Sequence, residues 1–376
     1  MFSRIEKYLR ERLKDIVFIE LKEGKGKKEK KIDALRGIPL PIPVKEFMNI
    51  VKKEKEIEEI SFMPIIKGMI ALIGLDSQFR HVPQYKQFLY TLDTDIESYI
   101  GYEGVKCAEK EQFWEALVYF KALLELNEDN INGLYNYARC CQDIAKRERD
   151  EETRKDMEQE AMNAFEKIIE KHPDFAPAYY YLGFYYANQR LFKKAQLTWE
   201  ACLKCESNLP EESRQEVIQQ LKNIEEDVQY EEGYLLILND RPDLGIEKLQ
   251  PLLEKYPDRW NLFFLVGLGY RKLGEIQQAI AYFEKALASR PTQAEVLNEL
   301  GLTYILCNEF EKAEKHLRKA SRIKENDPEI LCNLGIAYMG QKKKELAKEV
   351  LQKALQIEPE NERVLECLKK LDTICK

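Results

Sequence analysis

The chain has 376 residues, of which 44% are hydrophobic and 33% charged, with a formal net charge of −7. This much apolar sequence is enough to bury a large core. The charge is uneven, because residues 1–95 contain 19 Lys and Arg against 15 Asp and Glu, which leaves −11 for the rest. A basic excess this small, without a basic patch interleaved with aromatic residues, argues against nucleic-acid binding.

Two segments bear on the cellular compartment. Met1 to Lys14 is charged and amphipathic and lacks the apolar centre of a signal peptide. The most apolar run, Ile60 to Leu75, contains Pro64, Lys67 and two glycines and is too short to cross a bilayer. We therefore expect a cytoplasmic protein with no membrane span, whose nine cysteines are reduced thiols.

Residues 1–95 are predicted to form a mostly helical region that resembles no known family. Ile16 to Leu21 is either a short strand or the end of the first helix. Pro39 to Pro43 has proline at every second position, which predicts extended, polyproline-like chain. Apolar residues at helical spacing predict helices over Phe2 to Leu13, Val44 to Val51, Phe62 to Leu75 and Gln84 to Leu92.

Beyond these residues the sequence repeats with a fixed period. Gly233, Gly267, Gly301 and Gly335 stand 34 residues apart, which is typical of a chain built from stacked copies of one unit. We call these positions, and their counterparts in other copies, the glycine column.

The copy from Trp260 to Gln293 predicts a helix hairpin. Large apolar residues recur three and four apart from Leu262 to Leu273, and again from Ile276 to Leu287. Gly274 lies between these two helices and can take the left-handed conformation that ends a helix, so the helices lie antiparallel. The small residues Gly267 and Ala279 permit close helix approach, and aromatic residues fill the space around them.

The repeating columns are a large residue, Leu-Gly, Tyr, Ala, an aromatic residue or Leu, Ala and Pro. In the copy from Trp260 they are Phe263, Val266-Gly267, Tyr270, Ala279, Phe283, Ala286 and Pro291. This pattern resembles the tetratricopeptide repeat (TPR), a pair of antiparallel helices. The resemblance implies an all-α fold, a right-handed TPR superhelix (α-solenoid) of about seven helix-hairpin repeats.

Less regular copies and two insertions precede the regular block. The glycine column continues backward through Gly183, Ala138 and Gly104. Ala145 to Glu160 is nearly all charged and is predicted to lengthen two helices as a solvated extension. Pro210 to Lys222 is predicted to be an extra helix with proline near its start.

The predicted organisation has five parts. They are an N-terminal region of unknown family (1–95), a first TPR block of three units (96–206), the extra helix (207–225), a second TPR block of four units (226–361) and a C-terminal capping helix (362–376).

Several candidates for chemistry have simpler interpretations. Gly24 to Lys28 is similar to a phosphate-binding loop but lacks its spacing and its Ser or Thr, which favours a solvated loop. Cys202 and Cys205 have metal-ligand or redox spacing, but Cys202 falls in a column of small alanines and no second pair supports zinc. The three histidines are scattered. We therefore predict no catalytic residue, metal or cofactor, and no enzyme.

The resemblance implies that ligand-contacting residues lie three before and one after the glycine column, in a concave groove lined by first helices. These two offsets are four apart and stack on one helix face. They are Gly101 and Val105, Tyr135 and Arg139, Tyr180 and Phe184, Tyr230 and Tyr234, Phe264 and Leu268, Asn298 and Leu302, and Cys332 and Ile336. The predicted groove is aromatic in its middle.

Two functions remain open at this point. Some TPR domains hold the carboxylate of heat-shock chaperones with Lys and Asn at these offsets, whereas Phe264 and Leu268 favour an extended peptide or amphipathic helix with apolar anchors. The favoured function is a scaffold or adaptor that binds a protein or peptide partner. The alternative is a peptide-sensing regulator whose N-terminal region is the effector. A competing explanation is structural: the aromatic residues pack on each other, or on the N-terminal helices, and bind no partner. Oligomeric state and partner identity are left open.

Overall fold

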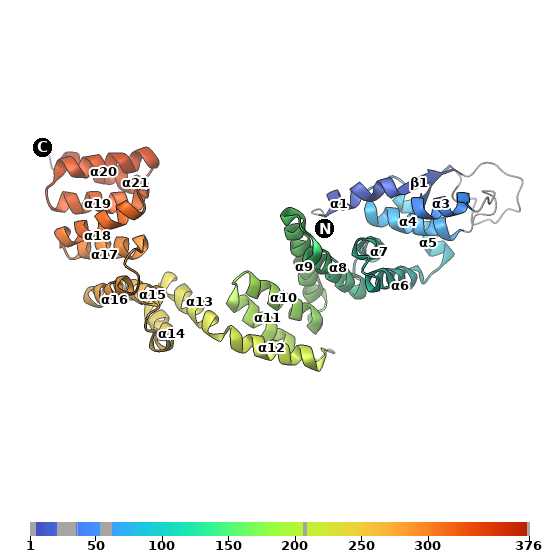
Figure 1. Ribbon diagram of the computed structural model, residues 1–376, viewed down its shortest axis with the longest axis horizontal. Coiled ribbons are helices and arrows are strands. Elements are labelled where there is room, and N and C mark those ends of the chain that lie inside the picture. The colour runs from blue at the N-terminus through green and yellow to red at the C-terminus, as the bar shows by residue number, and fades with distance from the viewer. Residues whose placement is uncertain (1–4, 21–34, 36, 53–61, 206–208, 374–376) are drawn as a thin grey trace, which may run out of the picture. The chain divides into compact units, whose positions relative to one another are not determined.

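The computed structural model describes residues 5–20, 35, 37–52, 62–205 and 209–373 (Figure 1). The chain divides into two compact units, Met1–Gln220 and Leu221–Lys376. The first unit therefore combines the N-terminal region with the first hairpins, and its boundary falls inside the insertion at Pro210 to Lys222. The predicted loop at Gly24 to Lys28 lies outside the described residues.

The N-terminal region contains helices and a two-stranded ribbon. Its elements are α1 (Glu6–Arg10), the 3-10 helix η1 (Glu11–Asp15), β1 (Ile16–Ile19), β2 (Leu40–Pro43), α3 (Val44–Lys52), α4 (Met63–Leu75) and α5 (Val82–Leu92). The prediction of polyproline-like chain at Pro39 to Pro43 was wrong, because β2 pairs antiparallel with β1. Leu40 and Ile42 keep their amide donors between the prolines, and proline is tolerated in a strand that needs donors on only one side.

Helix α4 is the centre of this region. A Cβ on Gly68 would lie 1.9 Å from the Pro41 carbonyl oxygen of β2, and one on Gly74 would lie 2.2 Å from the Val118 carbonyl oxygen of α7 (Phe113–Leu126). The two glycines therefore let the helix backbone touch the ribbon on one side and the first hairpin on the other. The apolar run that the sequence places here is buried protein core.

Seven helix hairpins follow in the described residues. Their helix pairs are α6 (Ile96–Glu109) with α7, α8 (Ile131–Arg147) with α9 (Glu151–Lys171), α10 (Ala176–Asn188) with α11 (Phe192–Lys204), α13 (Glu225–Leu238) with α14 (Pro242–Lys255), α15 (Trp260–Lys272) with α16 (Ile276–Ser289), α17 (Ala294–Leu306) with α18 (Phe310–Ile323), and α19 (Pro328–Gly340) with α20 (Lys344–Ile357). Two single helices, α12 (Glu211–Asn223) and α21 (Glu362–Thr373), follow the third and the seventh hairpin. The all-α repeat fold is confirmed.

Six of the seven hairpins in the described residues share one turn conformation. Gly274, seven residues after the glycine column, has φ +78°, as its predicted role requires. The same position in five other hairpins has φ between 59° and 62° and is occupied by Glu111, Arg190, Asp240, Asn308 and Lys342. The packed helices therefore impose the left-handed turn even on residues that disfavour it.

The insertion in the second hairpin is not the solvated extension that its charge suggests. It does lengthen α8 and α9, but Met157 is fully buried and Glu160 is 2% exposed. The Tyr8 hydroxyl donates to Asp156 Oδ2 at 2.9 Å, and the Tyr137 hydroxyl donates to Glu160 Oε1 at 3.0 Å. The prediction failed because only one face of this helix meets water, while the other packs under α1.

A first prediction concerns the glycine column. A Cβ on Gly183 would lie 2.1 Å from Trp199 Nε1, whereas one on Gly101 would meet its nearest atom at 3.7 Å. We expect Gly183→Ala to destabilise the protein by about 1–3 kcal/mol through overpacking. Gly101→Ala, the control, should be neutral or stabilise by up to about 1 kcal/mol through helix propensity. Urea unfolding measures both, and equal effects of the two substitutions would contradict this packing.

A second prediction concerns the insertion. Met157→Ala should lower the free energy of unfolding by about 2–4 kcal/mol, because the side chain is fully buried. Met48 on α3 is 47% exposed, so Met48→Ala should change it by no more than about 0.5 kcal/mol. The same unfolding assay tests the pair, and a neutral Met157→Ala would support a solvated extension after all.

Candidate functional site

Residues three before the glycine column connect helices that are not consecutive in the chain. In three places such a residue hydrogen-bonds to the helix after next, which is α12 for Tyr180, α15 for Tyr230 and α19 for Asn298. The Tyr180 hydroxyl donates to Glu216 Oε2 at 2.6 Å, Asn261 Nδ2 donates to the Tyr230 hydroxyl at 3.2 Å, and Asn298 Nδ2 donates to Glu329 Oε1 at 3.1 Å. This column therefore serves the stacking of the hairpins, and only part of it is free to meet a partner.

In the first unit, the four predicted site residues Tyr135, Arg139, Tyr180 and Phe184 belong to one chain of ring contacts. The Arg139 guanidinium lies 4.7 Å from the ring centroid of Tyr181 and donates to the hydroxyls of Tyr181 and Tyr135. Tyr181 in turn lies 4.9 Å from Tyr180, which lies 5.0 Å from Phe184. Burial raises the pKa of Tyr181 to about 12, so its hydroxyl stays protonated.

The inserted helix α12 covers part of this aromatic cluster. Besides Glu216, Ser213 hydrogen-bonds to Tyr180. Val217 is fully buried, and Arg214 donates to the Leu203 carbonyl oxygen at 3.2 Å. The explanation that these aromatic residues pack on each other therefore holds for the first unit, and α12, rather than the N-terminal helices, hydrogen-bonds to Tyr180.

In the second unit the predicted site residues differ in exposure. Tyr234 is 40% exposed on α13, whereas Asn298 is 6% exposed. Tyr230, Phe264, Leu268 and Leu302 are half-buried. Leu235 and Leu238 are 42% and 46% exposed on the same helix as Tyr234. Leu268 on α15 and Leu302 on α17 occupy the same repeat position as Tyr234. We call the surface formed by Tyr234, Leu235, Leu238, Leu268 and Leu302 the first-helix face.

Polar side chains of the second unit, of which Asn298 and Asn333 are buried, bond to one another beside this face. Asn333 Nδ2 donates to Asn298 Oδ1 at 2.9 Å, and an Arg363 guanidinium nitrogen donates to Asn333 Oδ1 at 2.8 Å. Arg271 pairs with Glu299 at 3.0 Å, and burial raises the pKa of the Glu299 carboxyl. Sequence reasoning missed Tyr181, Glu299 and Asn333. All three lie two before the glycine column, so this column carried a readable signal.

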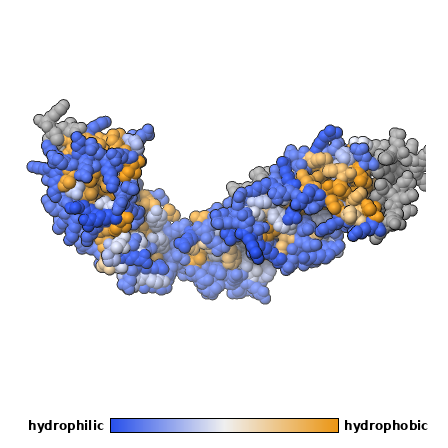
Figure 2. Space-filling view, turned by 45° about the horizontal axis from the view of Figure 1, so that its top comes forward, coloured by the Kyte–Doolittle hydropathy of each residue, from blue (hydrophilic) through white to orange (hydrophobic). Residues whose placement is uncertain are grey.

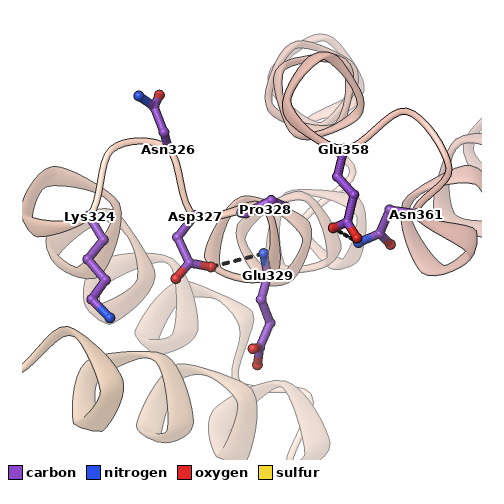
Figure 3. Close-up of a pocket in the computed structure, with 7 residues that line it drawn as sticks. All are labelled: Lys324, Asn326, Asp327, Pro328, Glu329, Glu358 and Asn361. Atoms are coloured by element: carbon purple, nitrogen blue, oxygen red, sulfur yellow. Dashed lines mark hydrogen bonds between the residues drawn. The ribbon is translucent and has the colours of Figure 1, made fainter. Parts of the chain in front are cut away.

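The pocket in Figure 3 lies at the loop that joins α18 to α19 and the loop that joins α20 to α21. It has a volume of about 570 Å³ and is lined by Lys324, Asn326, Asp327, Pro328, Glu329, Glu358 and Asn361. Asp327 Oδ1 accepts from the backbone nitrogens of Glu329 and Ile330, and Asn361 Nδ2 donates to Glu358. These polar groups cap helix ends and stabilise the loops.

The cysteine pair at CxxC spacing is structural. Cys202 is fully buried and its thiol donates to the Ala176 carbonyl oxygen at 3.3 Å, while Cys205 donates to the Pro173 carbonyl oxygen at 3.6 Å. Burial raises the pKa of Cys202 to about 12. Within the described ranges, no three His, Cys, Asp or Glu side chains are grouped to hold a metal ion. Nor does any helix in these ranges have the length and apolarity needed to cross a membrane.

The surface shown in Figure 2 is mostly hydrophilic, with apolar residues gathered in separate patches. Such a surface offers local anchor points for a partner. It offers no continuous apolar sheath.

Several solved structures are similar to this chain in part. The first TPR of Spaghetti (RPAP3), bound to an HSP90 peptide, is 21% identical, with 31% of this chain and 93% of that chain covered and a TM-score of 0.31. The second TPR domain of human RPAP3, in complex with an HSP70 peptide, is 24% identical, with 28% and 88% covered and a TM-score of 0.28. The type IV pilus biogenesis factor PilW is 18% identical, with 61% and 98% covered and a TM-score of 0.41. The search of curated proteins gave no match.

Family models agree with the hairpins. Four models described as tetratricopeptide repeat match residues 164–197, 230–294, 270–331 and 328–361. The match at 328–361 covers the pair α19 and α20, the other three begin or end within a helix, and a residue of the glycine column lies in each match. The chain is therefore a TPR repeat protein over residues 164–197 and 230–361.

Proposed function

We propose that this protein is an interaction scaffold that binds a protein partner through the first-helix face of its second unit. The observation that carries the proposal is the exposure of Tyr234, Leu235 and Leu238 within two turns of α13. Three neighbouring large apolar side chains in water are costly unless a partner covers them. A repeat array supplies binding surface rather than catalytic groups, which favours a non-enzymatic role.

The chemistry of the face favours an apolar ligand. Tyr234 and Leu238 are four apart and share one side of α13, and the half-buried Leu268 and Leu302 occupy the same offset as Tyr234 in later hairpins. The cations that would hold a terminal carboxylate are absent from these positions. An extended peptide or an amphipathic helix with apolar side chains at regular spacing suits this face.

A third prediction tests the scaffold. A displayed peptide library selected on the full chain should enrich sequences with regularly spaced apolar residues. Tyr234→Ala should weaken binding of the selected peptides at least about tenfold, because buried aromatic anchors contribute about 2 kcal/mol or more. Tyr102→Ala is the control, since Tyr102 is 64% exposed on α6 of the other unit. Equal binding by both variants would remove the first-helix face from the proposal.

A fourth prediction separates Tyr180 from Tyr234. Tyr180→Ala removes two ring contacts and the hydrogen bond to Glu216, so it should lower the free energy of unfolding by about 2 kcal/mol or more. Tyr234→Ala should lower it by no more than about 0.5 kcal/mol, because that side chain is 40% exposed. Urea unfolding of both variants provides the test. Stability losses in the reverse order would show that Tyr180 is the free residue.

The alternative function, a regulator with an N-terminal effector, has one observation in its favour. Helix α1 contacts α9, which carries the insertion of the second hairpin, and η1 contacts α7 of the first hairpin. Lys7 pairs with Glu152 at 2.6 Å and with Asp156 at 3.1 Å, and the Arg12 guanidinium lies 4.6 Å from the Trp114 ring. A movement of α9 would therefore alter its ion pairs with α1 directly. Loss of this packing on partner binding, detected as faster hydrogen exchange in α1 and η1, would favour the regulator.

A further inference from the structure

Two cysteines far apart in sequence meet at the end of the second unit. Cys332 on α19 is 2% exposed and Cys367 on α21 is 8% exposed, and both belong to one apolar cluster with Leu351 and Val364. The two side chains are hydrogen-bond partners, an arrangement that raises the pKa of the Cys332 thiol and lowers that of Cys367. This contact joins the last helix of the chain to the last hairpin.

The charges around the pair favour a thiolate at Cys367. The hydrogen bond with Cys332 lowers the pKa of Cys367, and the nearby cations of Arg363 and Lys370 lower it further against the opposing effect of burial. Arg363 lies one turn before Cys367 and is held by its hydrogen bond to Asn333, the residue next to Cys332. The cation is therefore positioned by the same two helices that carry the thiols.

Other buried cysteines in the described residues have a different environment. Cys202 and Cys205 donate to backbone carbonyl oxygens, which holds the proton on sulfur. Burial raises the pKa of Cys140 to about 12, and that of its neighbour Cys141 well above its ordinary value. A thiol next to a second thiol and to cations is the arrangement that supports oxidation, because the thiolate is the reactive form.

We propose that Cys332 and Cys367 form an oxidation site, at which a hydroperoxide converts the two thiols into a disulfide that fastens α21 to α19. The Cys367 thiolate attacks one peroxide oxygen, the O–O bond breaks, and hydroxide or an alkoxide leaves, so that Cys367 becomes a sulfenic acid. The Cys332 sulfur then attacks the Cys367 sulfur, the S–O bond breaks and water leaves. Two electrons pass from the two thiols to the peroxide.

The position of α21 determines both how an oxidant reaches the two thiols and what the disulfide does to stability. Within the described residues α21 packs on α19 and α20 and exposes its polar face, so local opening of this one helix would admit a small oxidant. The disulfide would close a loop with 34 residues between the two cysteines. Closing such a loop restricts the unfolded chain and stabilises the end of the array.

A fifth prediction tests the site on the full chain. The reduced protein is treated with hydrogen peroxide, free thiols are blocked with N-ethylmaleimide, and tryptic peptides are analysed by mass spectrometry. Peptides 325–342 and 364–369 contain one cysteine each. We expect them to be linked, the link to disappear with dithiothreitol, and the oxidised second unit to melt about 5 °C or more above the reduced one.

Matched variants distinguish this site from general oxidation. Cys367→Ala and Cys332→Ala should each abolish the link and the rise in melting temperature, whereas Cys205→Ala should keep both. Recovery of peptides 325–342 and 364–369 as maleimide adducts after peroxide treatment would overturn the proposal. So would a link that joins two protein molecules on a non-reducing gel, or a rise in melting temperature that persists in Cys367→Ala.

Discussion

Close approach of the two helices within each hairpin is the constraint on which the rest of this structure depends. A Cβ on Gly183 would lie 2.1 Å from Trp199, and one on Gly267 or Gly335 would lie 2.7 Å from Phe283 or Leu351. At these three positions only a residue without a side chain lets the large residue opposite reach the helix backbone. That contact fixes the register of the two helices. The register then determines which side chains face the next hairpin and which face water.

The same register explains why the proposed binding face and the stacking interface share residues. Positions three before the glycine column point toward the next first helix, so Tyr230 accepts a hydrogen bond from Asn261, and Asn298 donates one to Glu329. Residues one after the column lie a turn further along the helix and keep more surface, as Tyr234 does. A partner of the proposed face would therefore meet some side chains that are already hydrogen-bonded to a neighbouring helix. Each side chain that stabilises the stacking of two hairpins is no longer available to contact a partner.

Some charged residues of this protein are buried and hold helices together. Lys121 on α7 is 1% exposed, and burial lowers its pKa, while the charges of Glu6, Glu125 and Glu160 oppose that shift. Glu160 also accepts a hydrogen bond from Tyr137. Such buried charges are tolerated only when opposite charges and hydrogen bonds surround them. The N-terminal region and the insertion in α9 supply these partners, which ties the two segments to one another.

The sequence by itself determined the repeat, the hairpin, the left-handed turn at Gly274 and the small-residue role of Cys202. Each depends on periodicity or on a backbone preference within one unit, and such local signals survive without tertiary context. Only the tertiary structure decided that β2 pairs with β1, that Met157 is buried, that α12 engages Tyr180 and that Cys332 meets Cys367. In these four cases the partner lies on an element well separated in the chain, and no local pattern specifies which distant surface will cover a residue.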